Sequence, residues 1–431
     1  MRVLVLGAYG LIGAEVVRRL LADGVNVVGF GRSIAKGRRF FPEIDWRAGD
    51  LRTLTTVDDW APLLGSIDAV VNASGALQDG AKDTLALSQD KSICSCIEVC
   101  ARTGIKKFVQ ISAPGAVADA TTEFMRTKAN ADAALRASGL NWTILKPGLV
   151  ISAYAYGGTA LIRMLAAFPW VQPLMSARAR LQTVAAGDVA EAVALALTTE
   201  RMARLDVDLV EGQSHTLGEI VAAFRAWLGF SPAYAVLETP RLVGAFVARC
   251  ADLAAWLGWR SPLRTTALSV LAGNVLGDAA AGERALGRPL KSLGESLRAL
   301  PSTAQERVFA RAQLVFPALL MVLSGFWIAS GVIALLHGDA AASVLRGTPL
   351  ANDAEAFVMS GALLDIAIGV GLCVRATMRM AALAAVMLSA IYLAIGSVVT
   401  PELWADPLGP FVKVIPGIAL ALVVLALAEE R

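Results

Sequence analysis

The chain has a glycine-rich stretch near its start, Gly7-Ala8-Tyr9-Gly10-Leu11-Ile12-Gly13. It follows the apolar run Val3–Leu6 and precedes an amphipathic segment. In such a strand–loop–helix unit the first glycine permits a tight turn and the second lets the backbone approach a pyrophosphate. The third allows close helix packing, and the helix N-terminus presents free N–H groups to an anion. The spacing alone is a weak signal, but its place in a first βα unit predicts a dinucleotide site at residues 7–13.

Strand-like and helix-like patterns alternate over the first 230 residues. This alternation predicts an α/β fold with a Rossmann-type, doubly wound parallel sheet. Residues 216–219 read as a capping box that opens a further helix. The expected strands are Val3–Leu6, Asn26–Phe30, Ala69–Asn72, Phe108–Ser112, Trp142–Leu145 and Val207–Val210.

The C-terminal third contains four charge-poor apolar stretches. Each is near the roughly 20 residues that cross a bilayer as a helix. A mean hydropathy of +0.59 and a hydrophobic content of 56% are also high for a soluble enzyme. We therefore expect a four-helix transmembrane domain, the alternative being a buried helical bundle. The predicted spans are Leu314–Leu336, Phe357–Val374, Met380–Val399 and Phe411–Ala428.

Loop charges predict the orientation of these spans. Arginines precede the first span, lie between the second and third, and end the chain, whereas the other two loops are mainly acidic. The positive-inside rule then places both termini in the cytoplasm of a multi-pass protein of the inner (cell) membrane. We expect three domains: a dinucleotide-binding domain at 1–229, a helical substrate-side or connecting subdomain at 230–305, and the membrane domain at 312–431.

Composition argues against several other classes of protein. The first 311 residues carry a net charge of about +6, without the basic runs that nucleic-acid binding requires, so no nucleic-acid partner is expected. This surplus is compatible with a nearby anionic membrane surface. Five cysteines in 431 residues suggest a reducing compartment, and the cluster at 94–100 is read as core thiols rather than a metal site. The apolar N-terminus runs directly into the glycine loop and is read as a strand, not a signal peptide.

Residues after the second strand bear on the choice of cofactor. An acidic residue there would bind the ribose 2′-hydroxyl of NAD. This chain has Arg32 and Ser33 instead, with further basic residues soon after, which favours the 2′-phosphate of NADP (NADPH). The other interpretation is that these basic side chains only face water.

The chain resembles an atypical or extended short-chain dehydrogenase/reductase, similar to the NAD-dependent epimerase/dehydratase-like branch that includes the dehydrogenase-like accessory subunit of respiratory complex I. The apolar tail resembles DoxX-like membrane domains. The matching pieces over residues 1–220 are the glycine loop, Gly49-Asp50-Leu51, Asn72-Ala73-Ser74-Gly75, Ser112, Lys128, Pro147-Gly148 and Asp188-Val189-Ala190.

The resemblance implies roles for several of these residues. Asp50 and Leu51 would lie by the adenine, and Ala73, Ser74 and Gly75 would line the path of the pyrophosphate and ribose. Lys128 would bind the nicotinamide ribose, and Pro147 with Gly148 would flank the nicotinamide.

Catalytic members of the family use a Ser-Tyr-Lys arrangement, in which the phenol exchanges a proton with the substrate oxygen. This chain keeps Ser112 and Lys128 but has Phe124 at the tyrosine position. Because general acid–base help is typically worth about 10²–10⁴ in rate, we expect impaired carbonyl reduction. Tyr154 or Tyr156 are candidate substitutes, although both are equally explained as loop packing residues.

Three functions remain open on this basis. The chain is an oxidoreductase without the usual tyrosine, a non-catalytic NADPH sensor or assembly factor of a membrane protein complex, or a reductase or isomerase of a quinone or lipid. Asp365, in the middle of the second span, is costly in a membrane and is therefore either functional, with Lys413 as a candidate partner, or a helix-packing residue.

Overall fold

The computed structural model describes residues 1–75, 84–259, 261, 263–265 and 274–428. The chain forms two compact units. The sheet unit comprises Met1–Leu253 and Ser261–Ala310, and the bundle unit comprises Ala254–Arg260 and Arg311–Arg431. The predicted domain limits stay predictions, and residues 266–273 of the expected subdomain, like Arg431, lie outside the described residues.

A seven-stranded parallel sheet, in the order β11-β6-β5-β4-β1-β2-β3, is the centre of the sheet unit. The predicted doubly wound sheet and its six strands are confirmed. Strand β3 was not predicted, because it is a short edge strand with a charged, partly exposed sequence instead of an apolar run. The strands are β1 Arg2–Leu6, β2 Asn26–Gly31, β3 Asp45–Ala48, β4 Ala69–Asn72, β5 Lys107–Ile111, β6 Asn141–Pro147 and β11 Leu205–Leu209.

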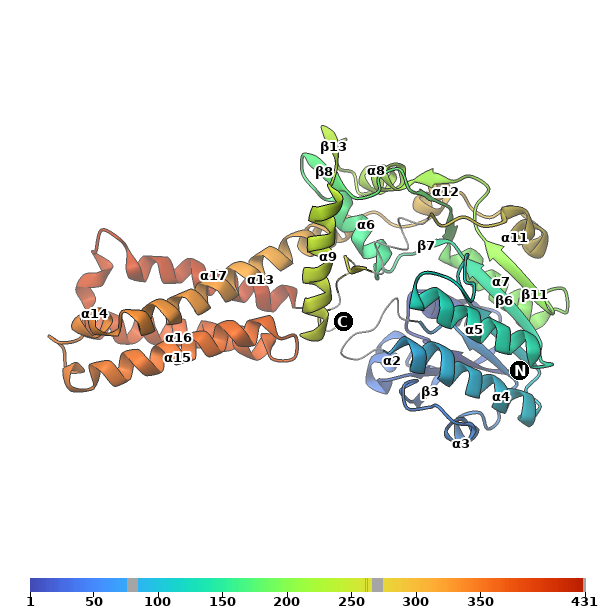
Figure 1. Cartoon of the computed structure of the whole chain (residues 1–431), viewed down its shortest axis with the longest axis horizontal. Helices are drawn as coiled ribbons and strands as arrows, with labels where there is room; N and C mark the ends of the chain where they lie inside the picture. Colours follow the sequence, from blue (N-terminus) through green and yellow to red (C-terminus); the bar gives the residue numbers. More distant parts are fainter. Residues whose placement is uncertain (76–83, 260, 262, 266–273, 429–431) are drawn as a thin grey trace. The chain divides into compact units, whose positions relative to one another are not determined.

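Helices cover both faces of this sheet (Figure 1). Strand β1 shows why, since Val3 and Val5 belong to one core cluster while Leu4 and Leu6 belong to the other. A strand buried on both sides is typical of parallel sheets. The first cluster includes α1 and α7, and the second includes α3, α4 and α5. Their bounds, with that of α2, are α1 Gly13–Ala22, α2 Ile34–Phe40, α3 Val57–Trp60, α4 Ser92–Thr103, α5 Glu123–Ala137 and α7 Ala186–Thr198.

Shorter elements complete the sheet unit. Strand β7 pairs with β10, β8 with β13 and β9 with β12. The predicted capping box is confirmed, because the Thr216 hydroxyl accepts from Glu219 N at 3.1 Å and the Glu219 carboxylate accepts from Thr216 N at 2.7 Å. The remaining elements are α6 Gly158–Ala166, α8 Leu217–Trp227, α9 Arg241–Trp256, α11 Ala279–Leu286, α12 Leu293–Arg298, β7 Leu149–Ile151, β8 Val171–Leu174, β9 Arg180–Leu181, β10 Thr183–Ala185, β12 His215–Thr216 and β13 Ala235–Glu238.

Four long helices form the bundle unit, and by length and composition each can cross a membrane. The mean hydropathy of their most apolar windows is 2.0–2.3, which agrees with the four predicted spans. Small residues let them approach closely: a Cβ built on Gly331 of the first helix would lie 2.5 Å from the Ala362 carbonyl oxygen of the second. The helices are α13 Ala304–Leu336, α15 Ala354–Cys373, α16 Met378–Val399 and α17 Pro410–Leu427, with the short α14 Gly338–Ser343 after α13.

Candidate functional site

The glycine loop after β1 is built as its sequence predicts. Gly7 has a positive φ of 74°, which favours glycine, and its carbonyl accepts from Gly10 N at 2.8 Å. A Cβ on Gly13 would lie 2.1 Å from the Gly7 carbonyl oxygen, so α1 packs directly on the loop. Leu11 and Ile12 pack on the first core cluster. The loop therefore places the N-terminus of α1 at the carboxyl end of β1, where doubly wound sheets bind nucleotides.

The end of β2 carries the residues predicted to choose the cofactor. Tyr9 of the glycine loop lies against this strand, since a Cβ on Gly31 would be 2.5 Å from the Tyr9 ring. The next residues are Arg32 and Ser33, and the Ser33 hydroxyl caps α2 by accepting from Lys36 N at 3.2 Å. The Ser33 oxygen thus accepts one hydrogen bond from its own helix, and its hydroxyl group can still donate another.

Asp50, predicted beside the adenine, follows β3. Its carboxylate accepts from the Arg52 guanidinium at 2.6 Å. This hydrogen bond is the main reason that the pKa of Asp50 is lowered, and the charge of Arg32 adds to the effect. Leu51 packs against the second core cluster. Arg32 and Asp50, 18 positions apart in the sequence, are thus electrostatic neighbours near the ends of β2 and β3.

The segment after β4 approaches the glycine loop. A Cβ on Gly7 would lie 3.0 Å from both the Ala73 carbonyl oxygen and the Ser74 Cα. Buried Asn72 holds this segment, because its Oδ1 accepts from Ser74 N at 3.1 Å and from the Ser74 hydroxyl at 2.5 Å. The sheet order reverses between β1 and β4, so these two loops flank the point at which such folds open a ligand crevice.

Lys128 of α5 joins the β4 and β5 ends. Its Nζ donates to the carbonyl oxygens of Ile111, at 2.9 Å, and Ser74, at 3.2 Å. A Cβ on Gly75 would lie 3.5 Å from the same nitrogen. The side chain is only 4% exposed, and this burial lowers the pKa of Lys128 to about 8, against an opposing effect from Asp132.

Asp132 belongs to the same side-chain cluster and was not predicted from the sequence. The Ser112 hydroxyl donates to Asp132 Oδ2 at 2.5 Å, and both residues are buried. Burial raises the pKa of Asp132, opposed by the Ser112 hydrogen bond and the charge of Lys128. Within the described part of the chain, the other carboxylate oxygen is buried without a hydrogen-bond partner. An available signal was the four-residue spacing from Lys128, which places both side chains on one helix face.

The aromatic residues around this cluster have different surroundings. Phe124 is half-buried in the first turn of α5, four residues before Lys128. Tyr154 points elsewhere: its ring lies 4.9 Å from the Arg18 guanidinium of α1 and 6.1 Å from the Phe40 ring of α2. Tyr156 is 50% exposed in the same loop. The structure thus gathers Ser112, Lys128 and Asp132, whereas the Tyr154 ring packs on α1 and α2.

Pro147 ends β6, beside the carboxyl end of β5. A Cβ on Gly148 would lie 2.4 Å from the Gln182 carbonyl oxygen, so the backbone at Gly148 packs directly against the backbone at Gln182. Asp188, in the last of the matching segments, is fully buried and accepts from Arg288 Nη2 at 2.7 Å and Lys291 N at 2.8 Å. The acidic residue therefore anchors the segment that leads into α12.

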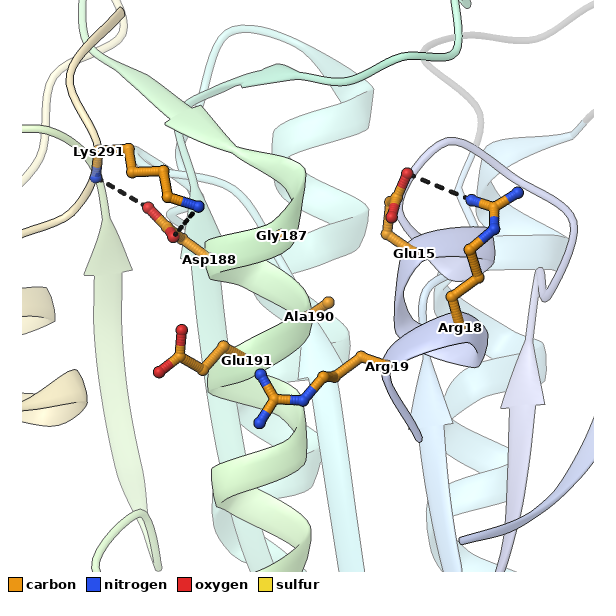
Figure 2. A pocket seen from close by; sticks show the side chains of 8 residues that line it. All are labelled: Glu15, Arg18, Arg19, Gly187, Asp188, Ala190, Glu191 and Lys291. Atoms are coloured by element: carbon orange, nitrogen blue, oxygen red, sulfur yellow. Dashed lines mark hydrogen bonds and ion pairs between the residues drawn. The ribbon is translucent and has the colours of Figure 1, made fainter. Parts of the chain in front are cut away.

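A separate pocket of about 350 Å³ lies between α1 and α7 (Figure 2). Glu15 pairs with Arg18 at 3.3 Å, and Asp188 with Lys291 at 3.7 Å. Because charges of both signs line it and neutralise one another, it lacks the uniform positive field expected for a diphosphate. Its lining residues are Glu15, Arg18, Arg19, Gly187, Asp188, Ala190, Glu191 and Lys291.

In the bundle unit, Asp365 of α15 is 6% exposed and contacts two other helices. Its carboxylate accepts from the Ser330 hydroxyl of α13 at 2.9 Å and the Tyr392 hydroxyl of α16 at 3.1 Å. Lys413, the candidate partner from the sequence, is exposed on α17. Among the residues that the structure describes, no group of three or more His, Cys, Asp or Glu side chains is placed to hold a metal ion.

Comparison with known proteins identifies two families along the chain. Residues 7–200 match the family described as NAD(P)H-binding, and residues 324–422 match the DoxX-like family. The chain is 29% identical over 147 residues to an NAD(P)H azoreductase of Xenophilus azovorans and 33% identical over 149 residues to the photosystem II assembly factor Ycf39 of Synechocystis sp.. Each match covers 34% of this chain, and they cover 47% and 44% of the relatives, so the chain spans about half of their lengths.

Solved structures share the fold of the sheet unit. A triphenylmethane reductase of Citrobacter sp., complexed with NADP(H), has a TM-score of 0.54 at 16% identity, covering 70% of this chain and 100% of that one. A UDP-N-acetylglucosamine 4-epimerase from Bacillus cereus has a TM-score of 0.51 at 16% identity, covering 72% and 96%. Residues 7–200 therefore match an NAD(P)H-binding family and have the fold of these enzymes, and residues 324–422 match the DoxX-like family, where the apolar helices indicate a membrane protein.

Proposed function

We propose that this protein is a membrane-anchored, NADPH-dependent oxidoreductase that passes hydride to an acceptor needing no proton from a tyrosine. One observation carries the proposal. The lysine of the family's catalytic set is in place, but Phe124 stands at the tyrosine position and the Ser112 hydroxyl donates to Asp132 at 2.5 Å. A carbonyl substrate would meet neither of the two hydroxyls that usually support its reduction.

The chain's own groups bind and orient the dinucleotide in this proposal. Backbone N–H groups of residues 7–13 and the N-terminus of α1 hold the diphosphate. Arg32 and Ser33 hold the 2′-phosphate, which makes NADPH the preferred cofactor. Lys128 is held by two carbonyl oxygens, which supports a role for its ammonium in binding the nicotinamide ribose. When bound, the reduced nicotinamide supplies a hydride, and the reduced acceptor then takes its proton from water.

An electron-poor conjugated acceptor, such as a quinone, suits this chemistry because its reduced form spreads the negative charge that hydride brings. The membrane domain makes a lipid-soluble acceptor accessible to the protein. The similarity to an NAD(P)H azoreductase is consistent with an acceptor other than a simple ketone. We place the protein in the inner (cell) membrane with both termini in the cytoplasm, on the charges of its loops.

A second candidate is a non-catalytic NADPH-binding protein that stabilises or assembles a membrane complex. The similarity to the assembly factor Ycf39 favours it, and so does the missing tyrosine. In this case cofactor occupancy, rather than turnover, would be read by a partner.

The test uses the full chain in lipid nanodiscs. NADPH binding is followed by fluorescence, and NADPH oxidation is measured with a soluble quinone, an azo dye and an aromatic ketone. We expect tight binding, oxidation with the quinone, and little with the ketone. Phe124→Leu serves as the matched control and should leave the quinone rate unchanged, whereas Lys128→Met should weaken binding.

Two results would change the proposed function. Rapid ketone reduction by the wild-type protein would overturn the proposal, because it requires a proton donor that the proposal excludes. Tight NADPH binding without oxidation by any acceptor, together with a membrane partner that co-purifies only when NADPH is present, would establish the assembly or sensor role instead.

A further inference from the structure

We propose that α9 is an interfacial membrane helix whose outer face is buried in lipid at the surface of the bilayer. The outer face of α9 comprises Leu242, Val243, Phe246, Val247, Cys250, Leu253 and Trp256. No family match includes this segment, since the two matches end at residue 200 and begin at residue 324.

The exposed side of α9 is apolar, which is the reverse of an ordinary surface helix. Its large side chains are among the most exposed apolar side chains described: Leu242 is 86% exposed, Trp256 76% and Phe246 69%. They recur at intervals of three and four residues, so they form one continuous face. A contiguous apolar surface of this kind marks a contact with a partner or a membrane.

The opposite side of α9 is already packed, and it too is apolar. Gly244, Ala248, Ala251 and Ala255 are buried. A Cβ on Gly244 would overlap the Met175 side chain, so this inner face fits closely against its neighbours. Because the small residues face inward and the large ones outward, the described residues of the sheet unit leave the larger apolar face exposed.

The C-terminal end of α9 leads into the bundle unit. Residues 254–259 pack there, where Trp259 Nε1 donates to the Cys373 carbonyl oxygen at 2.6 Å and Arg375 N donates to the Leu257 carbonyl oxygen at 2.9 Å. The Arg375 guanidinium lies over the Trp259 ring at 5.3 Å. These contacts lie at the connection between α15 and α16, where the apolar span of α15 ends and arginines follow it in the sequence.

This position identifies the partner as lipid. A tryptophan and an arginine at the end of a span are typical of the membrane interface. A helix that is anchored at this level and presents an apolar face meets the headgroup and acyl boundary, as amphipathic interfacial helices do. Arg249 is exposed on the same side, between the positions of Trp256 and Leu242, and its long side chain can reach the headgroups while its stem covers apolar surface. Asp252, at the edge of the outer face, is half-buried and accepts from Arg264 Nε at 3.1 Å.

Cys250 provides a direct probe, because it lies within the outer face and is the exposed one of the five cysteines. A nitroxide is attached to Cys250 in the full chain, and the protein is reconstituted in nanodiscs. Collisions of the label with oxygen, which partitions into lipid, are compared with collisions with a water-soluble nickel complex. We expect oxygen collisions to dominate at Cys250.

The matched control places the label on an exposed polar site, Arg284→Cys, in a Cys250→Ser background, where nickel collisions should dominate. Cys250→Ser alone reports any label at the other cysteines. Phe246→Glu should move the Cys250 label toward water, without being needed for the main result.

The inference is overturned if Cys250 and the Arg284→Cys control show the same collision ratio. It is also overturned if Cys250 is protected from both reagents and two labels in one nanodisc show short dipolar distances, since a second copy would then cover this face. Neither result depends on cofactor binding, so this test and that of the proposed function fail independently.

Discussion

Phe124→Tyr restores the missing phenol, and its effect on ketone reduction follows from the surrounding contacts. The added hydroxyl lies on α5, four residues before Lys128 and on the same helix face. A positioned general acid typically contributes about 10²–10⁴ in rate. The phenol also needs the Ser112 hydroxyl, which now donates to Asp132.

Moving the Ser112 hydroxyl away from Asp132 costs free energy, and this cost reduces the gain in rate from the added phenol. A hydrogen bond to a charged group contributes about 1.5–3 kcal/mol, which corresponds to roughly 10–150-fold in rate. The two effects together predict that Phe124→Tyr accelerates ketone reduction by about 10–100-fold. Adding Asp132→Asn replaces a charged acceptor by a neutral one, whose hydrogen bond contributes only about 0.5–1.5 kcal/mol. The difference of about 1–1.5 kcal/mol should make the double variant roughly 5–13-fold faster than the single.

The assay is the loss of NADPH absorbance with an aromatic ketone, using the full chain in nanodiscs. Phe124→Leu is the control for a change of size without a hydroxyl, and quinone reduction at saturating NADPH should be the same in Phe124→Tyr, Phe124→Leu and wild type. If wild type and Phe124→Leu reduce the ketone as fast as Phe124→Tyr, another group already donates the proton. If Asp132→Asn adds nothing to Phe124→Tyr, the Ser112–Asp132 contact does not restrain the serine.

Three other predictions address the cofactor and the bundle. Arg32→Asp should weaken NADPH binding by about 10–150-fold, the range of a charge-assisted hydrogen bond, with NADH within a few-fold; equal losses in fluorescence titrations would remove Arg32 from the site. Because the pKa of Lys128 is lowered to about 8, NADPH affinity should fall as pH rises through 8 and the ammonium loses its charge. Lys128→Met should bind more weakly and without this pH dependence, and an unchanged profile would assign the titration elsewhere. Asp365→Leu should destabilise the bundle by about 1–3 kcal/mol, since two interhelical hydrogen bonds are lost, whereas Asp365→Asn should be nearly neutral in thermal unfolding in nanodiscs. Equal melting temperatures for Asp365→Leu and wild type would refute a packing role.

Elements that depend on local patterns were predictable. The six strands and four apolar spans follow from runs of apolar residues, and the capping box at residue 216 from spacing alone. The glycine loop was also readable, because the need for glycine at positions 7 and 13 arises from contacts within one βα unit.

Contacts between distant segments were not predictable in the same way. The edge strand β3 has no apolar run and exists because it pairs with β2. Ser112 and Asp132 are 20 residues apart, and only the packing of α5 on the sheet brings the hydroxyl to the carboxylate. Tyr154 was a candidate acid from its position in the sequence, but its ring packs against Arg18 and Phe40.

The sequence by itself therefore determined the class of the protein, an N-terminal dinucleotide-binding sheet followed by a C-terminal set of apolar helices, and it predicted a catalytic set without its tyrosine. Tertiary structure decided what the remaining polar groups do, including the serine that faces Asp132 and the lysine held by two carbonyl oxygens. It also decided which side of α9 stays uncovered. The physical reason is that secondary structure and membrane insertion depend on short-range patterns of side chains, whereas the partners and burial of a polar group depend on how segments far apart in the chain pack together.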